Sequence, residues 1–370
     1  MVEPKRLVYL DNLRWSMIVL AVMVHAAVTY GPIGSWFYRD RSVVDPLSDI
    51  LLTLFPTFAQ AFFMGLLFFL AGYFVPSSLD RKGPRRFLAD RAWRLGLPTL
   101  LFMLAIAPPM VYLLYMQGTD FIGFYLTYLV NPLRWDSGPL WFAVALLLFT
   151  VIYTAGRRIG AFQHGIGLGK RSLVALVVLL VLSTFLVRLV FPIGTSVWNM
   201  QLCFFPQYAA MFLLGASIGI QGSVERIDRP LARPWMRVGL ALSALLLPAA
   251  LALGGAADGN FDAYSGGLTW QAAALVAWEQ VFGFSMIVGL VAIYRDRFDI
   301  RSKWAGLLAD NAFAMYVFHA PVLVGIAVLL STTALPGAAK FAALAGAGLL
   351  LTLLLAHTVL RRVPGLKAVL

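Results

Sequence analysis

The sequence predicts an all-α, polytopic integral membrane protein with about ten transmembrane helices. Its 370 residues are 61% hydrophobic and only 12% charged, whereas soluble domains average about 45–50% apolar and about 25% charged residues. Apolar runs of about 20 residues recur along the chain, which is the length needed to cross a hydrocarbon core about 30 Å thick. The composition is therefore that of a membrane protein and not of a soluble one.

Ten apolar runs are long enough to span a membrane as helices. We expect a single domain over residues 1–370, because no long polar insertion, low-complexity tract or internal repeat divides the chain. The first run follows Lys5 and Arg6 but contains Asp11 and Arg14, which predicts a retained span and not a cleaved signal peptide. The predicted spans cover residues 10–31, 51–75, 95–116, 138–156, 172–192, 202–221, 236–254, 270–293, 307–330 and 338–360.

Basic residues concentrate in alternate segments between these spans. Because Lys and Arg favour cytoplasmic loops, the alternation places both termini in the cytoplasm of a cell with the protein in its inner membrane. The net charge of +12 therefore reports orientation in the bilayer, and no nucleic-acid partner is expected. The six basic segments contain Lys5 and Arg6; Arg81, Lys82, Arg85, Arg86 and Arg91; Arg157, Arg158, Lys170 and Arg171; Arg226, Arg229 and Arg233; Arg295, Arg297, Arg301 and Lys303; and Arg361, Arg362 and Lys367.

Three ionisable residues share one face of the first predicted span: Asp11, Arg14 and His25. Arg14 and His25 are eleven residues apart, so an α-helix places them only about 20° apart around its axis and about 16 Å apart along it. Charged groups inside a membrane are costly and normally face a protein interior or a water-filled cavity. The stripe is a candidate catalytic site. The alternative is that Asp11 and Arg14 anchor the interface while His25 hydrogen-bonds a neighbouring span.

Three later spans also carry ionisable residues. His319 lies in span nine on the same helical face as Tyr316, Glu279 lies in span eight, and Arg188 lies in the outer half of span five. Each one alone is explained by a polar contact between helices. Together, two histidines, a glutamate and an arginine could supply a base, an orienting partner and a cation for acyl or proton chemistry.

The basic segment before span three is a candidate site for an anionic ligand. Arg91 and Arg94 are three residues apart, which predicts that they share a helical face, and Arg86 lies five residues before Arg91. Arginines at a membrane mouth suit a phosphate-bearing ligand, although topology alone could explain the residues up to Arg86. No Walker A, HExxH or CxxC motif occurs, and Cys203 is the only cysteine. We therefore expect no metal and no bound cofactor.

Five segments resemble the acyltransferase type 3 family, a group of membrane proteins that O-acylate glycans and related acceptors. They contain Arg14 with His25, Arg91 with Arg94, Trp141 and His319, and they read YLDNLRWSMIVLAVMVH, FFMGLLFFLAGYFV, RFLADRAWRLGLP, GPLWFAVALLLF and NAFAMYVFHAPV. The close spacing of the spans and the ERIDRP loop are most similar, though weakly, to the group that succinylates periplasmic glucans.

This resemblance implies a short acyl group, acetyl or succinyl, carried from cytoplasmic acyl-CoA to a hydroxyl of a cell-envelope glycan. His25 would be the general base or a transient acyl carrier beside Arg14 and Asp11. His319 would join the catalytic set, Arg86, Arg91 and Arg94 would bind the donor, and Trp141 and Tyr316 would lie on the acceptor side. Glu279 as a further catalytic residue and Arg188 on the acceptor side are expected mainly from their charge within predicted spans.

A transporter or flippase that moves an acyl group or glycan without chemistry is the main alternative. Intramembrane Arg, Glu and His would suit a proton-coupled pathway equally well. Against it, the ten spans show no paired halves with matching broken helices, which transporters built from repeats often have. A purely structural scaffold would leave the buried charges unexplained.

Overall fold

Ten helical segments are long and apolar enough to cross a membrane, which confirms the predicted count. The computed structural model describes residues 7–163, 165, 169–222 and 224–363, and the regular structure within them is helical. Lys5, Arg6 and Lys367 of the predicted basic segments lie outside these residues. The ten segments are Val8–Tyr30, Pro46–Lys82, Pro84–Tyr115, Gly138–Arg158, Lys170–Val190, Leu202–Gln221, Arg229–Leu253, Trp270–Arg297, Lys303–Leu330 and Gly337–Arg362.

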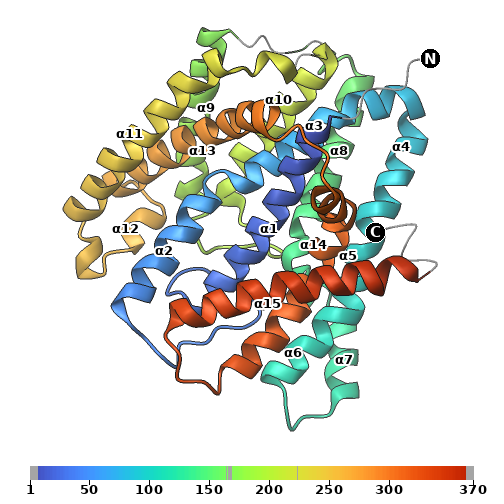
Figure 1. Ribbon diagram of the computed structural model, residues 1–370, viewed down its shortest axis with the longest axis vertical. Helices are drawn as coiled ribbons and strands as arrows, with labels where there is room; N and C mark the ends of the chain where they lie inside the picture. Colours follow the sequence, from blue (N-terminus) through green and yellow to red (C-terminus); the bar gives the residue numbers. More distant parts are fainter. Residues whose placement is uncertain (1–6, 164, 166–168, 223, 364–370) are drawn as a thin grey trace.

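Helix α1 (Val8–Tyr30) lies in the middle of the bundle (Figure 1). It contacts α2 (Pro46–Gln60), α3 (Phe63–Lys82), α13 (Trp270–Arg297), α14 (Lys303–Leu330) and α15 (Gly337–Thr358). Helices α8 (Trp141–Arg158), α9 (Lys170–Val190), α10 (Phe205–Gln221) and α11 (Arg229–Leu253) complete the set of long helices, and α12 (Asp262–Ser265) is a single turn. Most side chains of α1 are buried against other helices, whereas Arg14 is exposed.

Two predicted spans are interrupted helices. Span two breaks after α2, and the carbonyl oxygen of Ala61 at this break is buried and accepts a hydrogen bond of 2.9 Å from Gln207 Nε2. Span three consists of α4 (Pro84–Arg91), α5 (Leu97–Leu101) and α6 (Ala107–Tyr115), joined by the π-helical segments Ala92–Gly96 and Phe102–Ile106. The short helix α7 (Phe121–Leu129), which the sequence did not predict, caps the second π segment: Tyr125 and Tyr128 donate to the carbonyls of Leu104 and Met103.

Helices α3 and α10 approach each other at backbone contact. A Cβ atom added to Gly72 of α3 would lie 2.1 Å from the carbonyl oxygen of Phe212, and one added to Gly215 of α10 would lie 2.1 Å from that of Phe69. In a membrane, where lipid offers no hydrophobic driving force between helices, small residues permit this close packing. Helix α3 of this pair also contacts α1.

Segments predicted to lie on the same side of the membrane contact one another. The backbone N–H of Tyr9 donates to Asp299, and Arg295 donates to the carbonyl oxygen of Ile227, so three of the basic segments meet. Ile193 and Ser265 join two of the segments that the sequence predicts on the opposite side. This grouping agrees with the predicted alternation, and the orientation of both termini in a membrane stays a prediction.

Residues 31–45, the α1–α2 loop, fold back over the end of α1. The backbone N–H of Asp40 donates to the carbonyl oxygen of Thr29 at 2.8 Å. The Asp40 carboxylate pairs at 2.8 Å with Lys340 of α15, and the two side chains are only 5% and 2% exposed. Arg41 donates to the carbonyl oxygen of Tyr30. The first and last spans therefore hold this loop together.

Candidate active site

Two histidines predicted on different spans are in direct contact. His25 of α1 and His319 of α14 lie with Nδ1 and Nε2 3.0 Å apart, and their ring centroids are 5.0 Å apart. His319 is fully buried, whereas His25 is partly exposed. The sequence identified both residues, and the packing of α1 against α14 brings them together.

The hydrogen bonds of His319 fix the tautomers of the neutral pair. His319 Nδ1 lies 2.8 Å from the carbonyl oxygen of Tyr316, which can only accept, so Nδ1 carries the proton. In neutral imidazole the other nitrogen, Nε2, is then an acceptor. It accepts from His25 Nδ1–H. The unprotonated nitrogen of His25 is therefore Nε2, which has a lone pair available for a proton or an acyl carbon.

A tryptophan from the α1–α2 loop covers the histidine pair. The indole of Trp36 stacks on His25 with centroids 4.7 Å apart and planes inclined by 20°. It lies 6.3 Å from the His319 ring, at an angle of 12°. Trp36 Nε1 donates to Thr29 Oγ1, which itself donates to the carbonyl oxygen of His25. Sequence analysis missed this residue, because stacking from a loop has no periodic signal.

Asp11 and Arg14 contact each other at some distance from His25. Arg14 Nη2 and Asp11 Oδ1 are 2.5 Å apart, and the Arg14 side chain is 47% exposed. Eleven helical residues separate Arg14 from His25, a rise of about 16 Å. The predicted stripe on α1 therefore has a solvated ion pair at one end and the histidine site toward the other.

Arg188 of α9 and Glu279 of α13 form a buried ion pair. Arg188 Nη2 donates to both carboxylate oxygens, at 2.9 and 2.7 Å, and Gln280 donates to Glu279 Oε1 at 2.9 Å. The guanidinium carbon lies 5.2 Å from the Phe204 ring centroid. Arg188 Nε and Nη1 are buried without a protein hydrogen-bond acceptor. These N–H groups are available to an oxygen atom of a ligand or to water.

Tyr316 and Trp141 have defined partners near these residues. The Tyr316 hydroxyl donates to the carbonyl oxygen of Pro139. The group of Tyr316 that contacts the histidine pair is its backbone carbonyl oxygen, which accepts from His319 Nδ1. Trp141 stacks on Tyr208 with centroids 5.6 Å apart, and the Tyr208 hydroxyl accepts from Gln60 at 2.8 Å.

The three donor-site arginines differ in exposure. Arg86 and Arg94 are exposed, whereas Arg91 is partly buried with its guanidinium 5.3 Å from the Phe87 ring centroid. The π-helical turn that starts at Ala92 changes the angular spacing, so the α-helical argument for one shared face does not apply to Arg91 and Arg94. A pocket of about 280 Å³ lies between α3 and α8 at the same end, lined by Leu79, Asp80, Gly83, Pro84, Thr154, Arg157 and Arg158.

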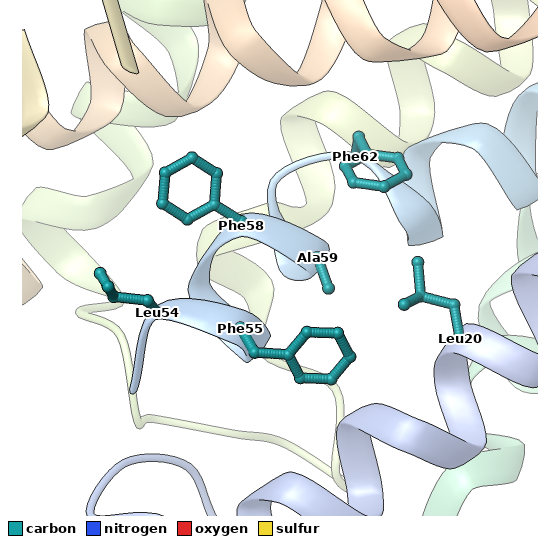
Figure 2. Close-up of a pocket in the computed structure, with 6 residues that line it drawn as sticks. All are labelled: Leu20, Leu54, Phe55, Phe58, Ala59 and Phe62. Carbon is teal, nitrogen blue, oxygen red and sulfur yellow. The ribbon is translucent and has the colours of Figure 1, made fainter. Parts of the chain in front are cut away.

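A second pocket, of about 300 Å³, is wholly apolar (Figure 2). Leu20 of α1 lies on one side of it and Phe55 and Phe58 of α2 lie on the other, and Leu54, Ala59 and Phe62 complete the lining. Because none of these side chains can transfer a proton or hydrogen-bond a polar group, this pocket can hold hydrocarbon but cannot supply the chemistry.

Asp136 is a further polar residue that sequence analysis missed. It precedes α8, and its carboxylate accepts from the backbone N–H of Gly138 at 2.7 Å and from the Asn199 amide. Burial raises the pKa of Asp136. The residue lies in an ordinary loop sequence, so no motif or helical face marks it.

Within the described residues, the ten apolar helices are those of a multi-pass membrane protein, and the histidine pair between two of them is a candidate acid–base site. The chain belongs to the acyltransferase type 3 family, because the family model described as an acyltransferase domain matches residues 7–357. This match confirms the family that the five sequence segments predict.

Curated relatives share part of the chain. Proteins named glucans biosynthesis protein C from Salmonella paratyphi B, Salmonella heidelberg and Salmonella enteritidis are 27% identical over 157 residues. The match covers 41% of this chain and 39% of each relative, so the chain spans about two fifths of the length of these relatives. No solved structure matches the chain.

The Arg188–Glu279 pair predicts strongly non-additive effects on stability. Glu279→Leu or Arg188→Met alone should each lower the free energy of unfolding by about 3–5 kcal/mol, because each leaves an uncompensated buried charge. The double variant should be much less destabilised than the sum of the two. Thermal unfolding in detergent is measured for the wild type, the two single variants and the double variant, which together form a double-mutant cycle. Additive losses would mean that the two side chains do not stabilise each other.

Proposed function

We propose that this protein is an O-acyltransferase that moves a short acyl group from acyl-CoA to a hydroxyl of a cell-envelope glycan. The observation that supports it best is the histidine pair, in which His25 Nε2 is left unprotonated by a chain of hydrogen bonds that begins at a backbone carbonyl. A neutral imidazole is the side chain best suited to take a proton from a hydroxyl near pH 7. The family match supports acyl transfer as the reaction.

In the proposed reaction, His25 Nε2 removes the proton from the acceptor hydroxyl. The hydroxyl oxygen then bonds to the thioester carbonyl carbon, and the carbon–sulfur bond breaks. The departing CoA thiolate takes the proton back from His25, so the products are an ester and CoA-SH. His319 keeps His25 in the required tautomer and orientation throughout. His25 could alternatively carry the acyl group on Nε2 between the two substrates.

We assign acyl-CoA binding to the basic end of span three. Arg86 and Arg94 are exposed there, and Arg91 is close by, so three guanidinium groups could pair with the donor's phosphates. The extended pantetheine arm would run along α1 toward His25. With both termini in the cytoplasm of an inner-membrane protein, the donor would enter from the cytoplasmic side.

We assign the acceptor to the side of Arg188, Glu279, Trp141 and Tyr316. The unpartnered N–H groups of Arg188 and the aromatic ring of Trp141 suit a hydroxylated, sugar-like molecule. The name of the relatives, glucans biosynthesis protein C, supports a glucan as the first acceptor to test. Acetyl and succinyl are the acyl groups that we propose to test with it.

Replacing His25 with Ala should lower acyl transfer by roughly 10²–10⁴-fold, because the general base is lost. His319→Ala should cause a smaller loss, and the double variant should be no worse than His25→Ala, since the two residues act as a unit. The assay is CoA release from acetyl-CoA or succinyl-CoA by protein in proteoliposomes, with a β-glucan oligosaccharide as acceptor and mass spectrometry of the sugar.

The matched control is His357→Ala, which removes an exposed histidine at the end of α15. It should transfer acyl groups at the wild-type rate. Full activity of His25→Ala would rule out the proposed base. Wild-type protein that consumes neither donor, but moves labelled glucan across the bilayer, would favour the transporter. An acyl group trapped on His25 would establish the carrier route.

Arg94→Ala should raise KM for succinyl-CoA about tenfold with little change in kcat, because a charge-assisted contact to phosphate is lost from both ground and transition states. The same variant should use succinyl-pantetheine, which lacks the nucleotide phosphates, as well as the wild type does. Arg134→Ala, an exposed arginine in a segment predicted on the opposite side, is the control. An equal effect with both donors would exclude phosphate binding at Arg94.

A further inference from the structure

The indole of Trp36 covers both imidazoles of the histidine pair from the same side. Its plane is within 20° of the His25 ring and 12° of the His319 ring, at centroid distances of 4.7 and 6.3 Å. The planes of the two imidazoles are inclined by 30°, and His25 Nδ1 lies 3.0 Å from His319 Nε2. A proton gained by His25, the nearer ring, would therefore place a positive charge against the face of the indole.

Among the residues that the structure describes, no carboxylate is hydrogen-bonded to the pair. The two rings bond to each other and to backbone carbonyl groups, those of Tyr316 and Met315 for His319 and that of Ala21 for His25. Many catalytic histidines rely on a buried carboxylate to stabilise the imidazolium that forms during the reaction. Here another group must supply that stabilisation inside a membrane.

The charged groups of the α1–α2 loop all have partners of their own. Asp40 pairs with Lys340 of α15, Arg41 pairs with Asp49 of α2, and Arg39 donates to the carbonyl oxygens of Gly31 and Pro32. On α14, the titratable side chains near His25 are those of His319 and Tyr316. His319 contacts His25 directly, whereas the Tyr316 hydroxyl donates to the carbonyl oxygen of Pro139. The face of an indole attracts a cation within about 6 Å of its centroid, and tryptophan does so best.

We infer that Trp36 is a positioning residue whose indole face stabilises the imidazolium formed when His25 takes the acceptor's proton. This inference rests on the proposed function of His25 as a base. The indole also prevents the His25 ring from turning, because Trp36 Nε1 is tied to Thr29 and Thr29 to the backbone of His25. The buried Lys340–Asp40 pair holds the loop that carries Trp36 against α1 and α15.

The test compares Trp36→Leu, which removes the aromatic face, with Trp36→Phe, which keeps a smaller one. Acyl transfer from succinyl-CoA or acetyl-CoA to a β-glucan oligosaccharide is measured against pH. Independently of turnover, modification of His25 by diethyl pyrocarbonate, which reacts with neutral imidazole only, is followed against pH by mass spectrometry. Trp304→Leu, on an exposed tryptophan at the start of α14, is the matched control.

Trp36→Leu should lower the maximal rate roughly 3–30-fold and move the half-modification point of His25 to lower pH by roughly 0.5–1.5 units. The acid limb of the rate profile should shift in the same direction. Trp36→Phe should lie between Trp36→Leu and wild type, and Trp304→Leu should match wild type.

A half-modification point that is the same in wild type, Trp36→Leu and Trp36→Phe would overturn the inference, whatever happened to the rate. So would Trp36→Phe behaving as Trp36→Leu does. These outcomes are distinct from failure of the proposed function, which would show as full transfer activity in His25→Ala. If Trp36→Leu does not fold, the comparison of Trp36→Phe with wild type decides the question by the same measurement.

Discussion

A single backbone carbonyl on α14 sets the chemistry available to His25 on α1. The Tyr316 carbonyl oxygen can only accept, so His319 must donate to it from Nδ1 and accept from His25 with Nε2. His25 then has its lone pair on Nε2, the nitrogen turned away from the pair. A rotation or shift of α14 relative to α1 would break this sequence of bonds. The close packing of the central helices is therefore a condition for the site and not only for the fold.

The same constraint, that a polar group in a membrane needs a partner, accounts for the other buried ions. Arg188 and Glu279 join α9 to α13, and Lys340 and Asp40 join α15 to the α1–α2 loop. Each pair crosses between segments that are distant in sequence, because a charge left alone in an apolar interior is far more costly than a paired one. The second pair also holds the loop that carries Trp36, so it connects the stability of the last span to the geometry of the histidines.

Much of the fold could be predicted because it depends on local sequence. Apolar length and alternating basic segments predict the ten spans. Ionisable residues inside these apolar runs, such as His25, Glu279 and Arg188, can also be recognised from the sequence. What depends on packing could not be predicted. The contact of His25 with His319 needs the relative placement of α1 and α14, and the pairing of Arg188 with Glu279 needs that of α9 and α13.

Irregularities of the backbone could not be predicted from the sequence either. The π-helical turn that starts at Ala92 alters the angular spacing of Arg91 and Arg94 around the helix axis, and no residue type in this segment predicts such a turn. The break between α2 and α3 lies inside a single predicted span, and α7 is too short to be counted as a span. Trp36 and Asp136 lie in loops, where no period relates a side chain to the face it meets.

The most direct test of the account is the protonation state of His25. The protein has only four histidines, so solid-state NMR of protein labelled with ¹⁵N-histidine in lipid bilayers can resolve each imidazole, with His25→Ala and His319→Ala for assignment. The account predicts that at neutral pH His25 carries its proton on Nδ1 and has an unprotonated Nε2, while His319 is protonated on Nδ1. A His25 that is protonated on Nε2, or a His319 that is protonated on Nε2 and not on Nδ1, would contradict it.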